Sequence, residues 1–138
     1  MAYLLDTNVI SEHRKQRPDQ HLVAWLRAVP ADHLFLSVIV IGEVRRGVEK
    51  LARRGDTRQA GLLDTWLAEL QRGFHHRIVP VTADIADQWG RLTAQHRVPF
   101  VDGVLAATAL THRWTLVTRN VADVAGTGVP VVNPFEPR

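Results

Sequence analysis

The chain opens with an unbroken apolar run that stops abruptly at polar residues. Tyr3–Leu5 is followed by Asp6, Thr7 and Asn8. A short run without polar alternation is typical of a central strand in a parallel sheet, where helices cover both faces. Ligands of such sheets bind just beyond the carboxyl ends of the strands, and Asp6 falls at that edge. An Asp here also commonly caps the following helix, so both interpretations of Asp6 stay open.

Strand-like and helix-like segments alternate along the rest of the chain. Strands are predicted near residues 3–5, 33–36, 77–81, 114–118 and 129–133, the last at a sheet edge, and helices near 9–15, 19–30, 37–54, 56–73, 82–96 and 98–110, with 134–138 as a tail. No repeat or linker divides these segments, so residues 1–138 are predicted to form one domain. The alternation predicts an α/β fold of three layers, with a central, mainly parallel sheet of about five strands flanked by helices.

The composition restricts the class of protein. Hydrophobic residues make up 46% of the chain, which is enough for a substantial core. Cysteine is absent, so neither disulfides nor thiolate metal sites can form, and we expect a reducing compartment, the cytoplasm by default. No apolar run approaches the roughly 20 residues that cross a membrane. The polar stretch from Asp6 to Lys15 does not fit a signal peptide.

The positive charge is carried almost entirely by arginine. Lys15 and Lys50 are the only lysines among 17 basic residues, and the pI is near 10.2. Arginine favours phosphate and carboxylate partners. Clusters such as Arg45-Arg46 fit a phosphate-rich partner, although each cluster could equally be a solvated helical face.

Three further acids occupy positions that suit a site. Glu43 lies beside a helical apolar stripe, Asp102 falls in the first turn of a helix rich in small residues, and Asp123 follows a strand. Each has an ordinary alternative: an ion pair between Glu43 and Arg46, a favourable helix dipole for Asp102, and a turn-shaping role for Asp123. Buried together, such carboxylates would repel one another and need a cation to stay ionised. The chain has no Cys and no His pair at helical spacing, which zinc sites commonly use. Its oxygen ligands therefore favour Mg²⁺ or Mn²⁺ over zinc.

Four short motifs resemble those of one known family, in the same order and at similar separations. They are Leu4-Leu5-Asp6-Thr7-Asn8, Ser37-Val38-Ile39-Val40-Ile41-Gly42-Glu43 with Arg45-Arg46-Gly47, Asp102-Gly103-Val104-Leu105-Ala106-Ala107-Thr108-Ala109, and Thr118-Arg119-Asn120. On these motifs nearly the whole chain resembles a PIN-domain ribonuclease of the VapC toxin type, in its FitB-like branch.

The resemblance implies roles for particular residues. Asp6, Glu43 and Asp102 would be the metal-binding acids of the active site. The fourth catalytic position would be filled by Asn120 or Asp123, or by both. The resemblance also implies roles for polar neighbours, with Thr7, Asn8 and Thr118 orienting the ligands.

The implied activity is hydrolysis of RNA phosphodiester bonds assisted by one or two Mg²⁺ or Mn²⁺ ions. Arg14, Arg45, Arg46 and Arg119 are candidates for steering the RNA backbone. No aromatic stacking platform is evident in the sequence, so we expect recognition by RNA shape and backbone. The resemblance further implies a small VapB-like antitoxin that wraps the helical face, and a homodimer within a possible larger toxin–antitoxin assembly.

Two other classes of protein share part of this sequence pattern. A phosphatase of the haloacid-dehalogenase type also begins with a strand that ends in Asp, but it would need Asp at Asn8 and a lysine late in the chain. The better alternative is a catalytically silent PIN-like module that binds RNA or serves as a scaffold. The presence of all three principal acids argues against it.

Overall fold

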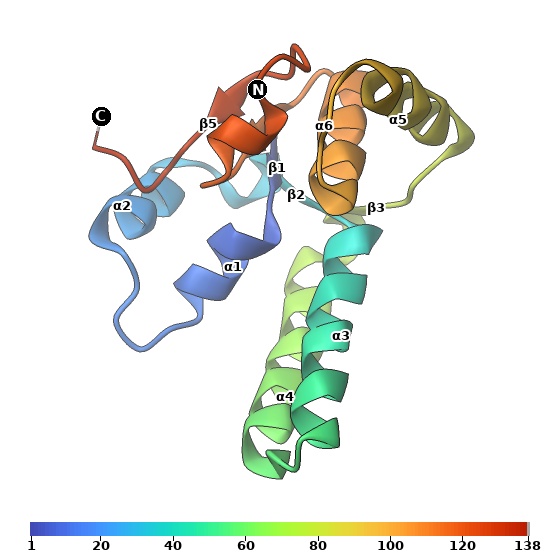
Figure 1. The fold of residues 1–138 in the computed structure, drawn as a ribbon. Helices are drawn as coiled ribbons and strands as arrows, with labels where there is room; N and C mark the ends of the chain where they lie inside the picture. The colour runs from blue at the N-terminus through green and yellow to red at the C-terminus, as the bar shows by residue number, and fades with distance from the viewer. Residues whose placement is uncertain (138) are drawn as a thin grey trace.

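Five parallel strands form the centre of the structure, a computed structural model that describes residues 1–137 (Figure 1). The strands are β1 (Tyr3–Leu5), β2 (Leu34–Ser37), β3 (Ile78–Val79), β4 (Thr115–Val117) and β5 (Val131–Val132). The α-helices are α1 (Thr7–His13), α2 (Gln20–Ala28), α3 (Val38–Arg53), α4 (Thr57–Phe74), α5 (Ala83–Gln95) and α6 (Phe100–His112), and the 3-10 helices are η1 (Ala31–His33), η2 (His75–Arg77) and η3 (Val121–Val124). The predicted α/β fold is confirmed. Arg138, the end of the predicted tail, lies outside the described residues.

The strand order β3-β2-β1-β4-β5 creates a crevice between β1 and β4. Connections from β1 lead toward β2 and β3, whereas the connection from β4 leads toward β5. Ligands of open α/β sheets bind where the chain changes direction in this way. Leu5 pairs with Val117 in this register, so Asp6 and Thr118 follow two adjacent strand ends.

The helices cover both faces of the sheet. Because crossovers between parallel strands are right-handed, α1 to α4 lie on one face and α5 and α6 on the other (Figure 1). Short polar side chains cap three of these helices: those of Asp19, Ser37 and Thr82 accept hydrogen bonds from the first turns of α2, α3 and α5.

The small residues of α6 let this helix pack closely in the core. Leu105, Ala106, Ala107 and Ala109 are fully buried. A Cβ added at Gly103 would lie 3.2 Å from Trp89 Nε1 on α5, which is tighter than an ordinary contact. This close packing holds the first turn of α6, and with it Asp102, at the edge of the sheet.

Helices α3 and α4 form a hairpin that extends away from the sheet (Figure 1). Its base is attached by Arg77, whose guanidinium donates to the carbonyls of Leu34 and Ala31 at 2.7 and 2.8 Å and of Gly73 at 2.8 Å. Arg77 was predicted to lie in a strand but belongs to η2. Strand β3 is short because its ladder ends before Pro80, which has no N–H to donate.

The other strands also differ slightly from prediction at their ends. β2 includes Ser37 but not His33, which lies in η1. β5 is confirmed at an edge and has two residues. Within residues 1–137, no helix is both long and apolar enough to cross a membrane.

Candidate active site

Asp6 lies buried at the start of α1, directly after β1, and is 4% exposed. Its Oδ1 accepts a hydrogen bond of 2.6 Å from the backbone N–H of Thr7, so Asp6 caps α1 as well as facing the crevice. Its Oδ2 accepts from the hydroxyl of Thr118 at 2.6 Å and from the amide of Asn8 at 3.3 Å. The capping interpretation is therefore confirmed. The other oxygen accepts from Asn8 on α1 and from Thr118 just after β4, and the ligand-binding role of Asp6 stays a prediction.

Asn8 and Thr118 form a polar bridge between the ends of β1 and β4. The Asn8 amide also donates to the Thr118 hydroxyl at 3.3 Å, and the Asn8 carbonyl oxygen accepts from the Arg119 backbone N–H at 3.3 Å. The Thr118 hydroxyl in turn accepts from the backbone N–H of Asn120 at 2.9 Å. These bonds hold the Asp6 carboxylate in one orientation.

Glu43 reaches the same site from α3. Its side chain is half-buried, and its Oε1 accepts a hydrogen bond from the hydroxyl of Thr7. Ser37 caps α3 at the end of β2, which sets the helix so that Glu43 faces α1. Asp102 comes from the opposite layer, in the first turn of α6, and is 8% exposed.

Asn120 and Asp123 lie on the loop after β4 in different ways. The Asn120 side chain hydrogen-bonds Asp102 and lines the cleft described below. Asp123 is exposed on η3, yet its charge is close enough to act on both Asp6 and Asp102. The structure thus places both candidates for the fourth position beside the acids.

These residues surround a cleft of about 540 Å³, called the acidic cleft below. Its lining comes from β1, α1, α3, α6 and the loop after β4: Asp6, Thr7, Asn8, Glu43, Arg46, Pro99, Phe100, Val101, Asp102 and Asn120. Side chains 114 positions apart in sequence therefore face one space. The cleft opens at the crevice between β1 and β4, as the strand order requires.

Burial and mutual repulsion raise the pKa of two of the acids. Desolvation is the largest cause for Asp102, followed by the charges of Asp6 and Asp123, and together they raise its pKa to about 6 despite the Asn120 hydrogen bond. Burial also raises the pKa of Asp6, against the lowering effect of the hydrogen bonds from Thr118 and Thr7. The cleft therefore favours either protons or a cation.

The donor chemistry of the acidic cleft fits a hard divalent cation. Carboxylate and amide oxygens are the ligands that Mg²⁺ and Mn²⁺ prefer, and polar neighbours already orient Asp6. Among residues 1–137, however, no three acidic, His or Cys side chains are gathered closely enough to form a complete ligand set. The carboxylate of Glu43 accepts the hydrogen bond from the Thr7 hydroxyl.

Of the four arginines proposed to contact RNA, Arg46 lines the acidic cleft. Its neighbour Arg45 donates a hydrogen bond of 2.8 Å to Asp64 on α4. The Arg14 guanidinium lies 5.3 Å from the centre of the Trp66 ring. The Arg119 guanidinium lies 3.7 Å from the centre of the Phe135 ring and 3.9 Å from Glu12.

Phe100 is a residue of the acidic cleft that the sequence pattern did not single out, and the expectation of recognition by RNA shape and backbone stays a prediction. Phe100 is 60% exposed and lines the acidic cleft. The available signal was its position directly after Pro99, two residues before Asp102, at the start of an otherwise buried helix.

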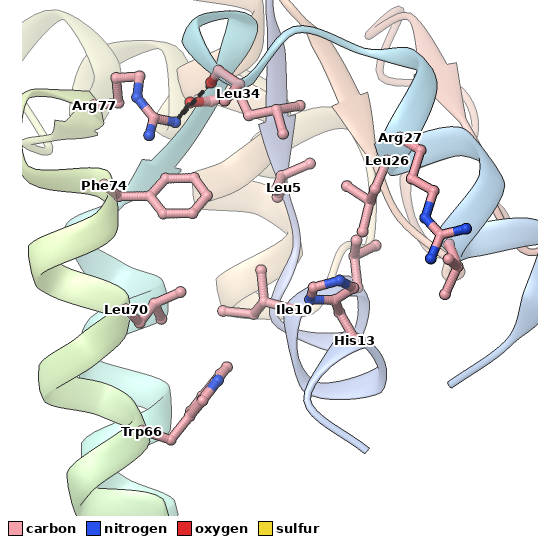
Figure 2. A pocket seen from close by; sticks show the side chains of 13 residues that line it. Leu5, Ile10, His13, Leu26, Arg27, Leu34, Trp66, Leu70, Phe74 and Arg77 are labelled. Carbon is pink, nitrogen blue, oxygen red and sulfur yellow. Dashed lines mark hydrogen bonds between the residues drawn. The ribbon is translucent and has the colours of Figure 1, made fainter. Parts of the chain in front are cut away.

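A second concavity of about 400 Å³ lies between α1, α2 and α4 and is called the apolar groove (Figure 2). In Figure 2, Leu70 and Phe74 of α4 face Ile10 of α1 and Leu5 of β1, with Trp66 farther along α4. The lining is mostly aliphatic and aromatic, with His13, Arg27 and Arg77 among the residues around it. This composition suits an apolar polypeptide segment better than a phosphate backbone.

Comparison with known proteins agrees with this architecture. The PIN domain family matches residues 3–122. A protein from Sinorhizobium fredii named VapC ribonuclease Y4jK is 32% identical over 139 residues, with 97% of this chain and 98% of the relative covered. The crystal structure of FitAcB from Neisseria gonorrhoeae has a TM-score of 0.87 at 31% identity, over 98% of this chain and 99% of the other. A toxin-antitoxin complex from Klebsiella pneumoniae has a TM-score of 0.68 at 30% identity, over 99% and 100%.

The fold and the acidic cleft define an α/β protein whose site lies at a change of strand direction. The chain belongs to the PIN-domain family.

Proposed function

We propose that this protein is a metal-dependent endoribonuclease toxin that a small antitoxin neutralises. The observation that carries the proposal is the convergence of Asp6, Glu43 and Asp102, from three different elements, on one cleft at the crevice between β1 and β4. The naming of the Sinorhizobium fredii relative as a ribonuclease supports the reaction. The absence of cysteine is consistent with action in the cytoplasm.

In this proposal Asp6, Glu43 and Asp102 hold one or two Mg²⁺ or Mn²⁺ ions, with Asn120 or Asp123 at the fourth position. A bound ion would supply an activated water nucleophile and stabilise charge on the phosphate. Thr118 and Asn8 keep Asp6 oriented, as hydrogen-bonding neighbours of metal ligands do, and Thr7 does so for Glu43.

Arg46 supplies positive charge inside a cleft that otherwise repels RNA. Its guanidinium would bind a phosphate oxygen and orient the backbone across the acids. Arg14, Arg45 and Arg119 remain candidates for more distant contacts with the RNA.

The direct test measures cleavage of single-stranded and structured RNA by the purified chain with Mg²⁺, with Mn²⁺ and with a chelator. We expect cleavage with either ion, none in chelator, and none from Asp6→Asn or Asp102→Asn. Asp87→Asn, which changes an exposed acid paired with Arg91 on α5, is the matched control and should cleave normally. RNA that is bound but stays intact with every ion would support the silent binding module instead.

We also propose that an apolar segment of the antitoxin docks in the apolar groove. The structure from Klebsiella pneumoniae is a toxin-antitoxin complex and shares this chain's fold over its full length. Trp66→Ala should weaken inhibition by the antitoxin while leaving cleavage by the free toxin unchanged. Leu62→Ala removes an exposed apolar side chain from the same helix, outside the groove, and should be inhibited like the wild type. Equal inhibition of both variants would place the antitoxin elsewhere. The homodimer stays a prediction, to be checked by the solution mass.

A further inference from the structure

The acidic cleft contains an exposed aromatic ring that metal binding and phosphate binding do not use. Phe100 is 60% exposed, although α6 is otherwise among the most buried helices of the described chain. It lines the cleft together with Asp6, Glu43 and Asp102. An exposed phenyl ring is unfavourable in water, so its position beside the acids points to a ligand that covers it.

The ring of Phe100 is held in place by its surroundings. Pro99 precedes it and sets the entry into α6. Trp89 of α5 meets it edge to face, with ring centroids 5.7 Å apart and an interplanar angle of 71°. Trp89 is itself packed against Gly103, one turn along α6. An edge-to-face contact covers at most one face of the Phe100 ring, so a face remains available for stacking.

We propose that Phe100 is a positioning residue that stacks on a nucleobase of the RNA strand in the acidic cleft. This inference rests on the proposed ribonuclease function and adds how that site recognises a single strand. Asp102 lies two residues after Phe100 in the first turn of the same helix. A nucleotide whose base stacks on the ring would therefore have its sugar-phosphate backbone beside the acids. Stacking on an aromatic ring tolerates any base but requires it to be unpaired, which favours single-stranded RNA or a loop.

The test is a cycle of substitutions in both protein and RNA. A short single-stranded substrate is prepared intact and as a series in which one nucleotide at a time is abasic, and KM and kcat are measured for each. With the wild-type protein, we expect one abasic position to raise KM by roughly tenfold, the size of one lost stacking contact. Phe100→Ala should raise KM for the intact RNA by a similar factor. With this variant, the abasic nucleotide at that position should cause no further rise in KM.

Further variants separate stacking from apolar contact and from folding. Phe100→Tyr keeps the ring and should restore KM, whereas Phe100→Leu keeps an apolar side chain and should not. Leu62→Ala removes an exposed apolar residue outside the cleft and should leave KM unchanged. Because the Phe100 side chain is mostly exposed, the variants should unfold near the wild-type temperature.

The outcomes distinguish the two proposals. The stacking proposal is wrong if the wild type cleaves RNA and Phe100→Ala cleaves it with the same KM. It is also wrong if the effect of Phe100→Ala on KM adds to the effect of every abasic position. In both cases the proposed ribonuclease function is retained. If Phe100→Ala instead changes the solution mass of the protein, the ring belongs to a contact between chains. If the wild type cleaves no RNA with any ion, both proposals fall.

Discussion

The hydroxyl of Thr118 donates a hydrogen bond of 2.6 Å to Oδ2 of Asp6, joining the ends of β4 and β1 across the crevice. The two residues are brought together by the register in which Leu5 pairs with Val117. The bond lowers the pKa of a carboxyl whose pKa burial raises. It therefore favours the ionised form that a cation requires.

Replacing Thr118 by Val should weaken catalysis and raise the pKa of Asp6 further, because the side chain keeps its shape but loses the donor. We expect the acid limb of the pH–activity profile to move to higher pH. Leaving a buried carboxylate with fewer donors should also cost about 1–3 kcal/mol of unfolding free energy. Thr118→Ser retains the hydroxyl and should behave nearly as the wild type in urea unfolding and in the pH profile. An unchanged profile in Thr118→Val would argue against this role.

Asp102 should destabilise the metal-free protein as the pH rises. Its pKa is raised from 3.8 to about 6 on folding, so the folded state binds the proton more tightly. The contribution of the Asp102 proton to the free energy of unfolding is fully present below pH 3.8 and is lost as the pH rises through about 6. In chelator, Asp102→Asn should therefore unfold at a higher temperature than the wild type at pH 7.5. The difference should shrink toward pH 4.

Metal binding should show the opposite dependence on pH. Protons compete with the cation for Asp102, so Mg²⁺ or Mn²⁺ should raise the unfolding temperature more at pH 7.5 than at pH 5. Asp102→Asn should lose most of this rise. Thermal unfolding across an ion titration measures both effects. A rise of the same size at both pH values would mean that the ion binds elsewhere.

Arg46→Ala and Arg45→Ala should differ although the residues are neighbours. Arg46 lines the acidic cleft, whereas Arg45 is held by Asp64. Arg46→Ala should weaken RNA binding and reduce the slope of log K against log salt by about 1, as expected for one lost phosphate contact. Arg45→Ala should leave both nearly unchanged. Equal losses would show that RNA extends along the α3–α4 hairpin.

Gly103→Ala and Gly90→Ala test the close packing of α6 on α5. Both glycines lie inside helices, where Ala is favoured by about 1 kcal/mol. A Cβ at Gly90 meets nothing within 4 Å, but one at Gly103 lies 3.2 Å from Trp89 and 3.3 Å from Thr93. Gly90→Ala should therefore stabilise the protein, and Gly103→Ala should gain less or lose stability. Urea unfolding of the two variants side by side makes the comparison.

The sequence by itself determined the order of the elements and the residues at the strand ends. Apolar runs without alternation predicted buried parallel strands, and Asp19, Ser37 and Thr82 marked helix starts because a short polar side chain satisfies free N–H groups there. The end of the first apolar run likewise placed Asp6 at the carboxyl edge of the predicted sheet. These features depend on local chemistry, which a linear pattern records.

Only the tertiary structure decided which side chains share the acidic cleft and which groups hold them. Adjacent residues of a helix point about 100° apart, so Arg45 and Arg46 face different surroundings. The packing of α4 against α3 places Asp64 beside Arg45, whereas Arg46 lines the acidic cleft. The exposure of Phe100 depends on where α6 meets the edge of the sheet. The hydrogen bond from Thr7 to Glu43 depends on how α3 lies against α1. Such relations are set by distances between elements remote in sequence, which no local pattern contains.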